Sequence, residues 1–536
     1  MSSVGTLIIG SGVAAAAVAK RLLDYNPSAS ILMLEAGQRV KMQEASIWQD
    51  YLVTGKLPYT KYYDRAFPER DQPGENVNAG KTSVTLNGAR VFTYGGSTIH
   101  WGGWSFRMKP EDFTLAKNTG RGIDWPFAYE DFEKYYGIAE HYLGVSGDST
   151  DQTVARSTSY PFPAFPYTLE DQPMIAALKS RGLSYSHLPI ARRGVSAQPS
   201  RDAPCQTTGT CKYCPFGARY SANNYIDNML HWGHYPNLQI QLGAVVQQLI
   251  MSSKNRVAAV EFLDSSDGNL KRISAHRVIV AAGAIESAKL LKRSRSDFWP
   301  AGVGNAYDLI GRHIVTHPYF IFQGTQKSSN LKRLQPEMNF PTLVSRHFDS
   351  AAEQAEGKFI LVNPPGSPKV DLAKMMRRGN GRAEIERAVD APATFEIHGM
   401  VEVFGDHSNY IDNHPMPNFI GIPQTLVDYS EDPGFSARMA KIQSVVSEVF
   451  EAMDTTLTGK PSVSWRADHA ACTVRMHSTP EVGVVNENLR VHNVDNLFVC
   501  SNGVFPNLGA VNPTLTLTGL AFRLGDHLAQ DDGGAS

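Results

Sequence analysis

The chain has 536 residues, of which 42% are hydrophobic, so it is long enough for two domains with large cores. The charges of its 51 basic and 52 acidic side chains nearly cancel, so the composition argues against a strongly basic surface that would attract nucleic acid or an anionic membrane. No segment reaches the roughly 20 apolar residues that span a bilayer, and the apolar N-terminus lacks a basic n-region. We therefore expect a cytoplasmic protein, unless it is exported together with a partner subunit that carries the signal.

The first predicted elements are a buried strand over residues 6–9 and an alanine-rich helix over residues 13–23, joined by a turn that contains glycine. In that turn Gly10 permits the tight bend, and Gly12 lets a pyrophosphate approach the backbone. Ala15 is small enough for the helix to pack against the strand. Because the helix N-terminus then faces the phosphates, this segment predicts a dinucleotide-binding turn.

A second apolar run, over residues 31–34, ends at Glu35, twenty positions after Ala15. A carboxylate at this place can accept hydrogen bonds from a ribose 2′-hydroxyl, which favours an adenosine ribose without a phosphate. The motif alone does not separate FAD from NAD.

Two later buried strands indicate that the dinucleotide domain returns along the chain. Residues 278–281 run into a helix near Gly283, and residues 496–500 lead to Gly503 and a final helix. The stretches between these blocks are richer in proline and aromatic residues, and they contain strand-like runs such as residues 394–404. We therefore predict the α/β class with two interleaved domains. The predicted dinucleotide domain comprises residues 1–150, 205–325 and 463–536, and the predicted substrate domain comprises residues 151–204 and 326–462.

Four blocks, residues 6–35, 95–103, 281–287 and 469–514, stand in the order typical of one family, and the second reads Gly-Gly-Ser-Thr-Ile-His-Trp-Gly-Gly. They resemble the glucose-methanol-choline (GMC) family of FAD-dependent oxidoreductases. The His100-Trp101 pair in the second block, together with residues 409–412 and 421–424, is most similar to pyranose oxidases and bacterial sugar dehydrogenases. The resemblance implies a Rossmann-like FAD domain and an α+β substrate domain with an antiparallel sheet.

The resemblance also implies which residues hold FAD. In the pyranose-oxidase-like branch, the histidine before this tryptophan is bonded to the 8α carbon of the flavin. For His100, such a bond and simple packing against the flavin ring both stay open. The residues expected to bind FAD are Gly10, Gly12, Ala15, Glu35, Gly95, Gly96, Ser97, His100, Val246, Ala282, Gly283, Asn502, Gly503, Asn512, Pro513 and Thr514.

The family's reaction needs a base, because the hydroxyl proton must leave as hydride moves from carbon to flavin N5. Histidine suits this role, since its ordinary pKa of about 6.5 leaves it able to accept a proton at neutral pH. His469 matches the family's catalytic position, and Asn512 matches the partner that would hold the substrate oxygen. We do not expect Asp468 to pair with His469, because successive side chains of an extended segment point to opposite faces. The predicted activity is oxidation of a secondary alcohol of a sugar or glycoside to the ketone.

Three of the five cysteines, Cys205, Cys211 and Cys214, lie within ten residues of one another. The segment resembles the iron–sulfur segment of bacterial FAD-dependent glucose dehydrogenases, although the last spacing is shorter by one residue. Thiolates are the usual ligands of such a cluster. A reduced structural loop, or one disulfide beside a free thiol, is the alternative. A cluster would favour transfer of electrons to a partner protein, whereas a bare flavin would favour oxygen, a quinone or another small acceptor.

Two further functions stay open at this point. A flavin-bound lyase of the same fold would keep FAD oxidised with every alcohol, and an NAD-dependent dehydrogenase would share only the opening turn. We expect a small-molecule substrate, no nucleic acid and no membrane span, and either a homo-oligomer or a small partner subunit. The sequence does not name the sugar, the carbon that is oxidised or the electron acceptor.

Overall fold

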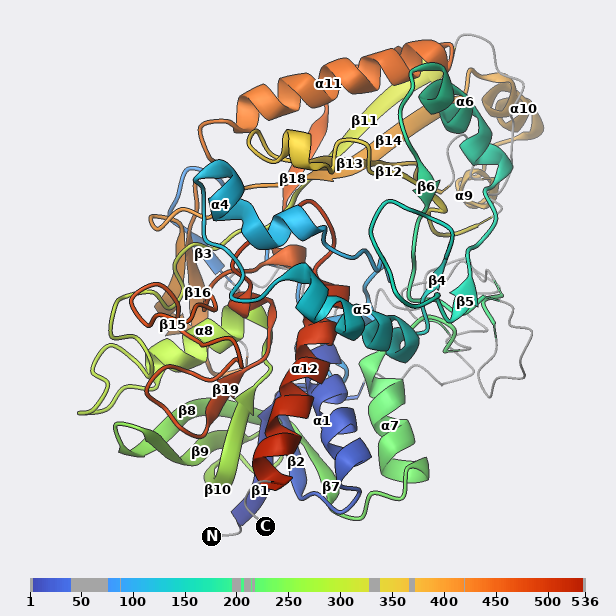
Figure 1. Cartoon of the computed structure of the whole chain (residues 1–536). Helices are drawn as coiled ribbons and strands as arrows, with labels where there is room; N and C mark the ends of the chain where they lie inside the picture. Colours follow the sequence, from blue (N-terminus) through green and yellow to red (C-terminus); the bar gives the residue numbers. More distant parts are fainter. Residues whose placement is uncertain are drawn as a thin grey trace.

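The computed structural model describes residues 3–39, 76–86, 88–194, 204–206, 214, 217–326, 338–365, 372–418 and 420–533. Figure 1 shows two regions, each built on its own sheet. The lower region carries both ends of the chain, and the upper one lies beneath the long helix α11 (Phe435–Ala452).

The lower sheet is parallel at its centre. The strand β1 (Ser3–Ile9) pairs in parallel with β2 (Ile31–Glu35) on one side and with β10 (Asn269–Val280) on the other, and Ile8 lies opposite Ile279. The segments predicted as returning strands are therefore neighbours in one sheet, as expected for a doubly wound fold. In spatial order its strands are β7 (Leu238–Leu242), β2 (Ile31–Glu35), β1 (Ser3–Ile9), β10 (Asn269–Val280), β9 (Arg256–Asp264) and β8 (Ala244–Ser253), with β19 (Leu497–Val499) also on β10.

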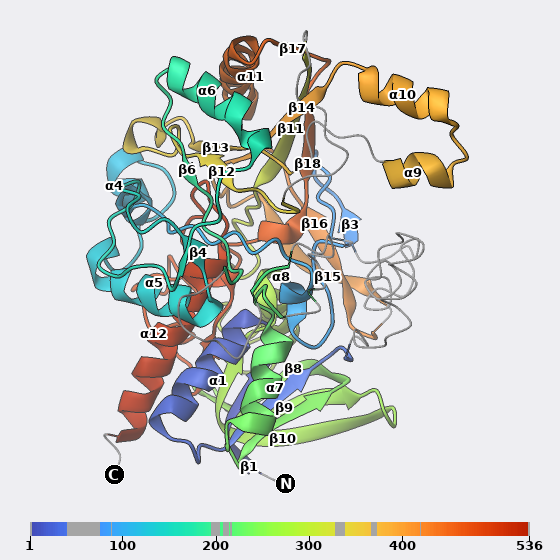
Figure 2. The same cartoon turned by 90° about the vertical axis from the view of Figure 1, so that its right-hand side faces the viewer.

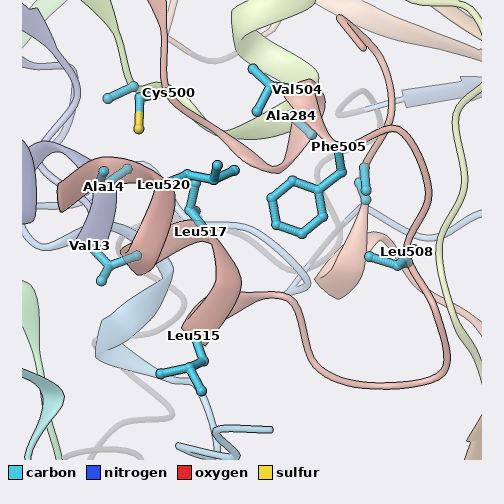
Figure 3. Packing of buried hydrophobic residues seen from close by; sticks show 14 of the residues in the cluster. Val13, Ala14, Ala284, Cys500, Val504, Phe505, Leu508, Leu515, Leu517 and Leu520 are labelled. Atoms are coloured by element: carbon cyan, nitrogen blue, oxygen red, sulfur yellow. The ribbon is translucent and has the colours of Figure 1, made fainter. Parts of the chain in front are cut away.

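Helices from both ends of the chain cover this sheet. The helix α1 (Val13–Tyr25) lies beside α12 (Thr514–Gly533) in both views (Figures 1 and 2). Figure 3 shows Val13 and Ala14 of α1 near Leu517 and Leu520 of α12, all of them buried. Since apolar burial contributes about 25 cal/mol per Å², this contact fixes the C-terminal segment against the dinucleotide-binding turn. The other helices of this region are α5 (Tyr129–Leu143), α7 (Ala222–Trp232) and α8 (Gly283–Arg293).

The upper sheet is antiparallel, which confirms the predicted fold class. Side chains of β11 (Pro318–Gln326) alternate, so Phe320 and Phe322 are fully buried on one face while Tyr319 lies on the other. The helices α11 and α6 (Gln172–Ser180) lie at the outer side of the sheet (Figure 1). In spatial order its strands are β17 (Thr455–Leu457), β11 (Pro318–Gln326), β14 (Thr394–Val401), β13 (Phe359–Val362), β12 (Leu343–Ser345) and β6 (Ser186–His187), with β18 (Ser462–Trp465) also on β11.

The domain boundaries stay a prediction, and β11, which the sequence assigned to the dinucleotide domain, hydrogen-bonds within the upper sheet. Across the part of the chain that the structure describes, no helix is both long enough and apolar enough to cross a membrane. The remaining strands and α-helices are β3 (Asn76–Asn78), β15 (Tyr410–Pro417), β16 (Pro423–Asp428), β4 (Ser146–Gly147), β5 (Phe162–Pro163), α4 (Leu115–Thr119), α9 (Leu372–Arg377) and α10 (Arg382–Asp390).

Candidate active site

A cavity of about 800 Å³ extends from the dinucleotide-binding turn to the upper sheet. One end is lined by residues at the carboxyl ends of β1, β2 and β10, where parallel α/β sheets bind their ligands. The other end is lined by side chains of β11, β14 and β18. The cavity therefore joins a nucleotide-type site to a pocket in the substrate domain.

The turn after β1 leaves room for a ligand against bare backbone. Gly10 has φ +107°, and a Cβ there would lie 2.6 Å from the carbonyl oxygen of Ala281. Only glycine fits that position. A Cβ on Gly12 would meet no atom within 4 Å, and Gly12 lines the cavity. This open space at the N-terminus of α1 fits a pyrophosphate.

The carboxylate of Glu35 is buried beside this turn. It accepts hydrogen bonds from Ser11 Oγ at 2.6 Å and from the Gly37 amide at 2.8 Å. Burial raises the pKa of Glu35, and these two bonds act in the opposite direction. Each carboxylate oxygen can accept a further bond, and Glu35 lines the cavity, so the carboxylate fits the predicted contact with a ribose hydroxyl.

Most of the residues predicted to bind FAD line this cavity, and four do not. Two asparagines of the lining, Asn502 and Asn512, carry buried Oδ1 atoms that have no hydrogen-bond partner within the described residues, so a bound ligand can satisfy them. The predicted residues that line it are Gly10, Gly12, Glu35, Gly96, Ser97, His100, Val246, Ala282, Gly283, Asn502, Asn512 and Thr514. Those that are not part of the lining are Ala15, Gly95, Gly503 and Pro513.

The predicted catalytic pair meets in the cavity. Asn512 Nδ2 lies 3.1 Å from His469 Nε2, and both residues line the cavity. The other ring nitrogen, His469 Nδ1, lies 3.0 Å from Nδ1 of His317, the residue directly before β11. The Nε2 atom of His317 lies 2.8 Å from the carbonyl oxygen of Gly509.

These contacts fix the tautomers of both histidines. A carbonyl oxygen can only accept, so His317 Nε2 carries a hydrogen, and in neutral His317 the Nδ1 atom is bare. His469 must therefore donate from Nδ1, which leaves its Nε2 lone pair facing Asn512 Nδ2. Burial lowers the pKa of His469 to about 4, and burial together with His469 lowers that of His317 to about 3. Both rings are neutral at physiological pH, and His469 Nε2 is ready to accept a proton.

The segment before His469 differs from the prediction. Ala467–His469 forms a 3₁₀ helix, so the expected extended conformation is wrong. The carboxylate of Asp468 accepts a hydrogen bond from Arg466 Nε at 2.7 Å, which neutralises it locally. His469 Nδ1 donates its hydrogen bond to another histidine, His317, instead.

Sequence reasoning missed His317 and the wall formed by Tyr319, Met400 and Ser464, all of which line the cavity. The available signal was the alternation of residues 318–326, which places odd-numbered side chains on one face of a strand. That pattern does not reveal which face meets the site, because the partner strands come from distant segments.

The predicted cysteine ligands are only partly described. Cys205 and Cys214 are half-buried, and Arg192 Nη1 lies 3.5 Å from Cys205 Sγ. Cys211 lies outside the described residues. Within those that are described, no three His, Cys, Asp or Glu side chains are grouped to hold a metal, and the iron–sulfur cluster stays a prediction.

Comparisons with known proteins agree with this geometry. The GMC oxidoreductase N- and C-terminal family models match residues 172–319 and 413–521. The large subunit of fructose dehydrogenase from Gluconobacter japonicus is 26% identical over 99% of this chain and 98% of its own length. A 6′′′-hydroxyparomomycin C oxidase from Streptomyces lividus is also 26% identical, over 98% of this chain and 92% of its own.

A solved structure shows the same fold. The formate oxidase of Aspergillus oryzae superimposes with a TM-score of 0.66 at 15% identity, covering 100% of this chain and 99% of that one. The two sheets of this chain therefore follow a known fold. The chain is a flavoprotein enzyme that belongs to the GMC oxidoreductase family.

Proposed function

We propose that this enzyme oxidises a secondary alcohol of a sugar or glycoside to the ketone, with His469 as general base. The observation that carries the proposal is the bare Nε2 atom of His469. It faces the cavity beside Asn512, and its tautomer is fixed by His317. Bound FAD would accept the two electrons that leave the alcohol carbon.

The residues present account for the movement of the proton. The substrate hydroxyl takes the place of Asn512 Nδ2 as the donor to His469 Nε2, and the resulting imidazolium keeps its Nδ1 hydrogen bond to neutral His317. The amide of Asn512, which contacts His469 Nε2 in the structure, would then donate to the substrate oxygen as negative charge develops on it, and this favours the transition state over the neutral alcohol. His317 holds the base in one orientation without taking the proton.

The substrate class is supported by the relatives and by the cavity. The fructose dehydrogenase subunit and the paromomycin-type oxidase are named for a sugar and for an aminoglycoside. About 800 Å³ is ample for a ring substrate in addition to part of a dinucleotide.

The test is anaerobic mixing of the wild-type enzyme with a panel of hexoses and methyl hexopyranosides. We expect at least one member to bleach the flavin absorbance and to yield a ketone at a ring carbon. If every sugar leaves the flavin oxidised while simple alcohols bleach it, the proposed substrate class is wrong.

A further inference from the structure

The wall of the cavity opposite the dinucleotide-binding turn carries a hydrogen-bonded line of three side chains. Tyr319 OH lies 2.7 Å from His398 Nδ1, and His398 Nε2 lies 2.7 Å from Glu396 Oε2. Gln323 Nε2 donates to the other carboxylate oxygen at 2.8 Å. The line starts at the cavity lining and runs outward, since the side chain of His398 is 14% exposed and that of Glu396 is 28% exposed.

The upper sheet places these side chains on one face. Tyr319 lies directly opposite Met400 on β14 and opposite Ser464 on β18, and all three line the cavity. One pair further along the same face, His398 faces Ile321. The line is therefore built into the wall of the substrate pocket by strand register and does not depend on a loop.

The hydrogen-bond directions along this line follow from its outer end. The hydrogen bond from His398 holds the pKa of Glu396 below its ordinary value, so the carboxylate is ionised and can only accept. His398 must donate from Nε2, and in neutral His398 the Nδ1 atom is then bare. Nδ1 accepts the phenol hydrogen of Tyr319. Burial raises the pKa of Tyr319, so this hydrogen stays on the phenol.

Tyr319 therefore uses its only donor hydrogen in the bond to His398. Its phenol oxygen keeps lone pairs and meets a ligand as an acceptor. His469 Nε2, in the same cavity, is also an acceptor. A ligand with one hydroxyl can donate to only one of them, and a buried acceptor left unpaired weakens binding.

We propose that Tyr319 is a substrate-recognition residue that accepts a hydrogen bond from a second hydroxyl of the substrate, one that is not oxidised. The enzyme thereby selects polyhydroxylated substrates over mono-alcohols. This inference rests on the proposed function, because it concerns the same substrate. His398 and Glu396 act through Tyr319 as positioning residues, since they dictate the direction in which its hydrogen points.

The experiment compares each sugar that bleaches the flavin of the wild-type enzyme with its monodeoxy analogues. In the wild type, we expect removal of one particular non-reacting hydroxyl to lower kcat/KM roughly 10- to 100-fold. In Tyr319→Phe, kcat/KM for the parent sugar should fall by about that factor. Removal of the same hydroxyl from the substrate should then lower kcat/KM of the variant no further. The control is Tyr135→Phe, which removes a phenol hydroxyl that contacts Asp526 away from the cavity; it should keep the wild-type preference.

Two substitutions of His398 separate recognition from structural damage. In His398→Asn the amide oxygen takes the place of Nδ1 and still accepts from Tyr319, so the preference for the hydroxyl should persist. In His398→Gln the polar end takes the place of Nε2, Tyr319 loses its acceptor, and the preference should fall. Flavin content verifies folding of each variant.

The outcomes separate this inference from the proposed function. A sugar that is oxidised, but whose deoxy analogues give the same ratios in the wild type and in Tyr319→Phe, would overturn the role of Tyr319 alone. Failure of every sugar to bleach the wild-type flavin would overturn both proposals.

Discussion

His317 and His469 face each other through their Nδ1 atoms at 3.0 Å, and His317 is tied at its other nitrogen to the backbone carbonyl of Gly509. In this arrangement only one direction is possible for the hydrogen bond between the two neutral rings, with His469 Nδ1 as the donor and His317 Nδ1 as the acceptor. This direction leaves Nε2 of His469 without a hydrogen, so the backbone carbonyl of Gly509 determines the tautomer of the base.

Substitutions of His317 test this relationship. In His317→Asn the amide oxygen replaces Nδ1 and accepts from His469, whereas in His317→Gln only the contact with Gly509 is kept. Because a buried donor left unpaired costs about 1–3 kcal/mol, we expect kcat to fall roughly 10- to 100-fold in His317→Gln and much less in His317→Asn, with similar KM values. Equal activity of the two variants would show that His317 does not orient the base.

Acid should inactivate the enzyme by protonating His469. Since burial lowers its pKa to about 4, kcat/KM should be constant from neutral pH down to about pH 5. It should then fall as pH drops through about 4, because the protonated ring cannot accept. A profile of kcat/KM between pH 3.5 and 8 measures this limb, and a limb near pH 6.5 would contradict the assigned environment.

The same pKa has a consequence for stability. A histidine whose folded pKa lies below its unfolded value of about 6.5 binds its proton more readily in the unfolded chain. The contribution of His469 to the free energy of unfolding is therefore fully present above pH 6.5. It decreases by about 1.4 kcal/mol per unit as pH falls from 6.5 towards 4. Urea denaturation of the wild type and of His469→Gln should show a weaker pH dependence for the variant, and parallel curves would contradict it.

Two glycines of the dinucleotide-binding turn should respond differently to substitution. In Gly12→Val the side chain enters space where a Cβ meets no atom within 4 Å, so the variant should fold normally but purify with little FAD. In Gly10→Ala the φ of +107° and the 2.6 Å approach to Ala281 should lower the melting temperature as well. Flavin absorbance per protein and thermal unfolding measure the two effects, and full flavin occupancy in Gly12→Val would contradict the placement of FAD.

The visible absorption spectrum tests the cofactor content. We expect the two-banded yellow spectrum of an oxidised flavin, and a colourless protein would contradict FAD binding. A broad brown shoulder that disappears in Cys214→Ser would establish the iron–sulfur cluster that the resemblance of this segment implies. If the wild-type spectrum lacks this shoulder, these cysteines hold no iron–sulfur cluster and have a structural role.

Local sequence signals predicted the dinucleotide half of the molecule well. The turn at Gly10 and Gly12 and the strands that return to β1 have strong local patterns, because a parallel sheet buried on both faces needs apolar runs. The pair His469 and Asn512 was predicted through family resemblance, and the structure brings the two residues within 3.1 Å.

The substrate wall could not be predicted in this way. Tyr319, His398 and Ser464 meet through antiparallel register between distant strands, and a shift of one residue would move each side chain to the other face. His317 gives no local signal either, because its role depends on Gly509, which lies 192 positions later in the chain.

The measurement that tests the central claim most directly is the rate of flavin reduction in His469→Ala, mixed anaerobically with a sugar that reduces the wild-type enzyme. If His469 is the general base, the variant should keep its FAD, and the reduction rate should fall by a factor of about 10² to 10⁴. Reduction at close to the wild-type rate, with FAD fully bound, would contradict the assignment of His469 as the base.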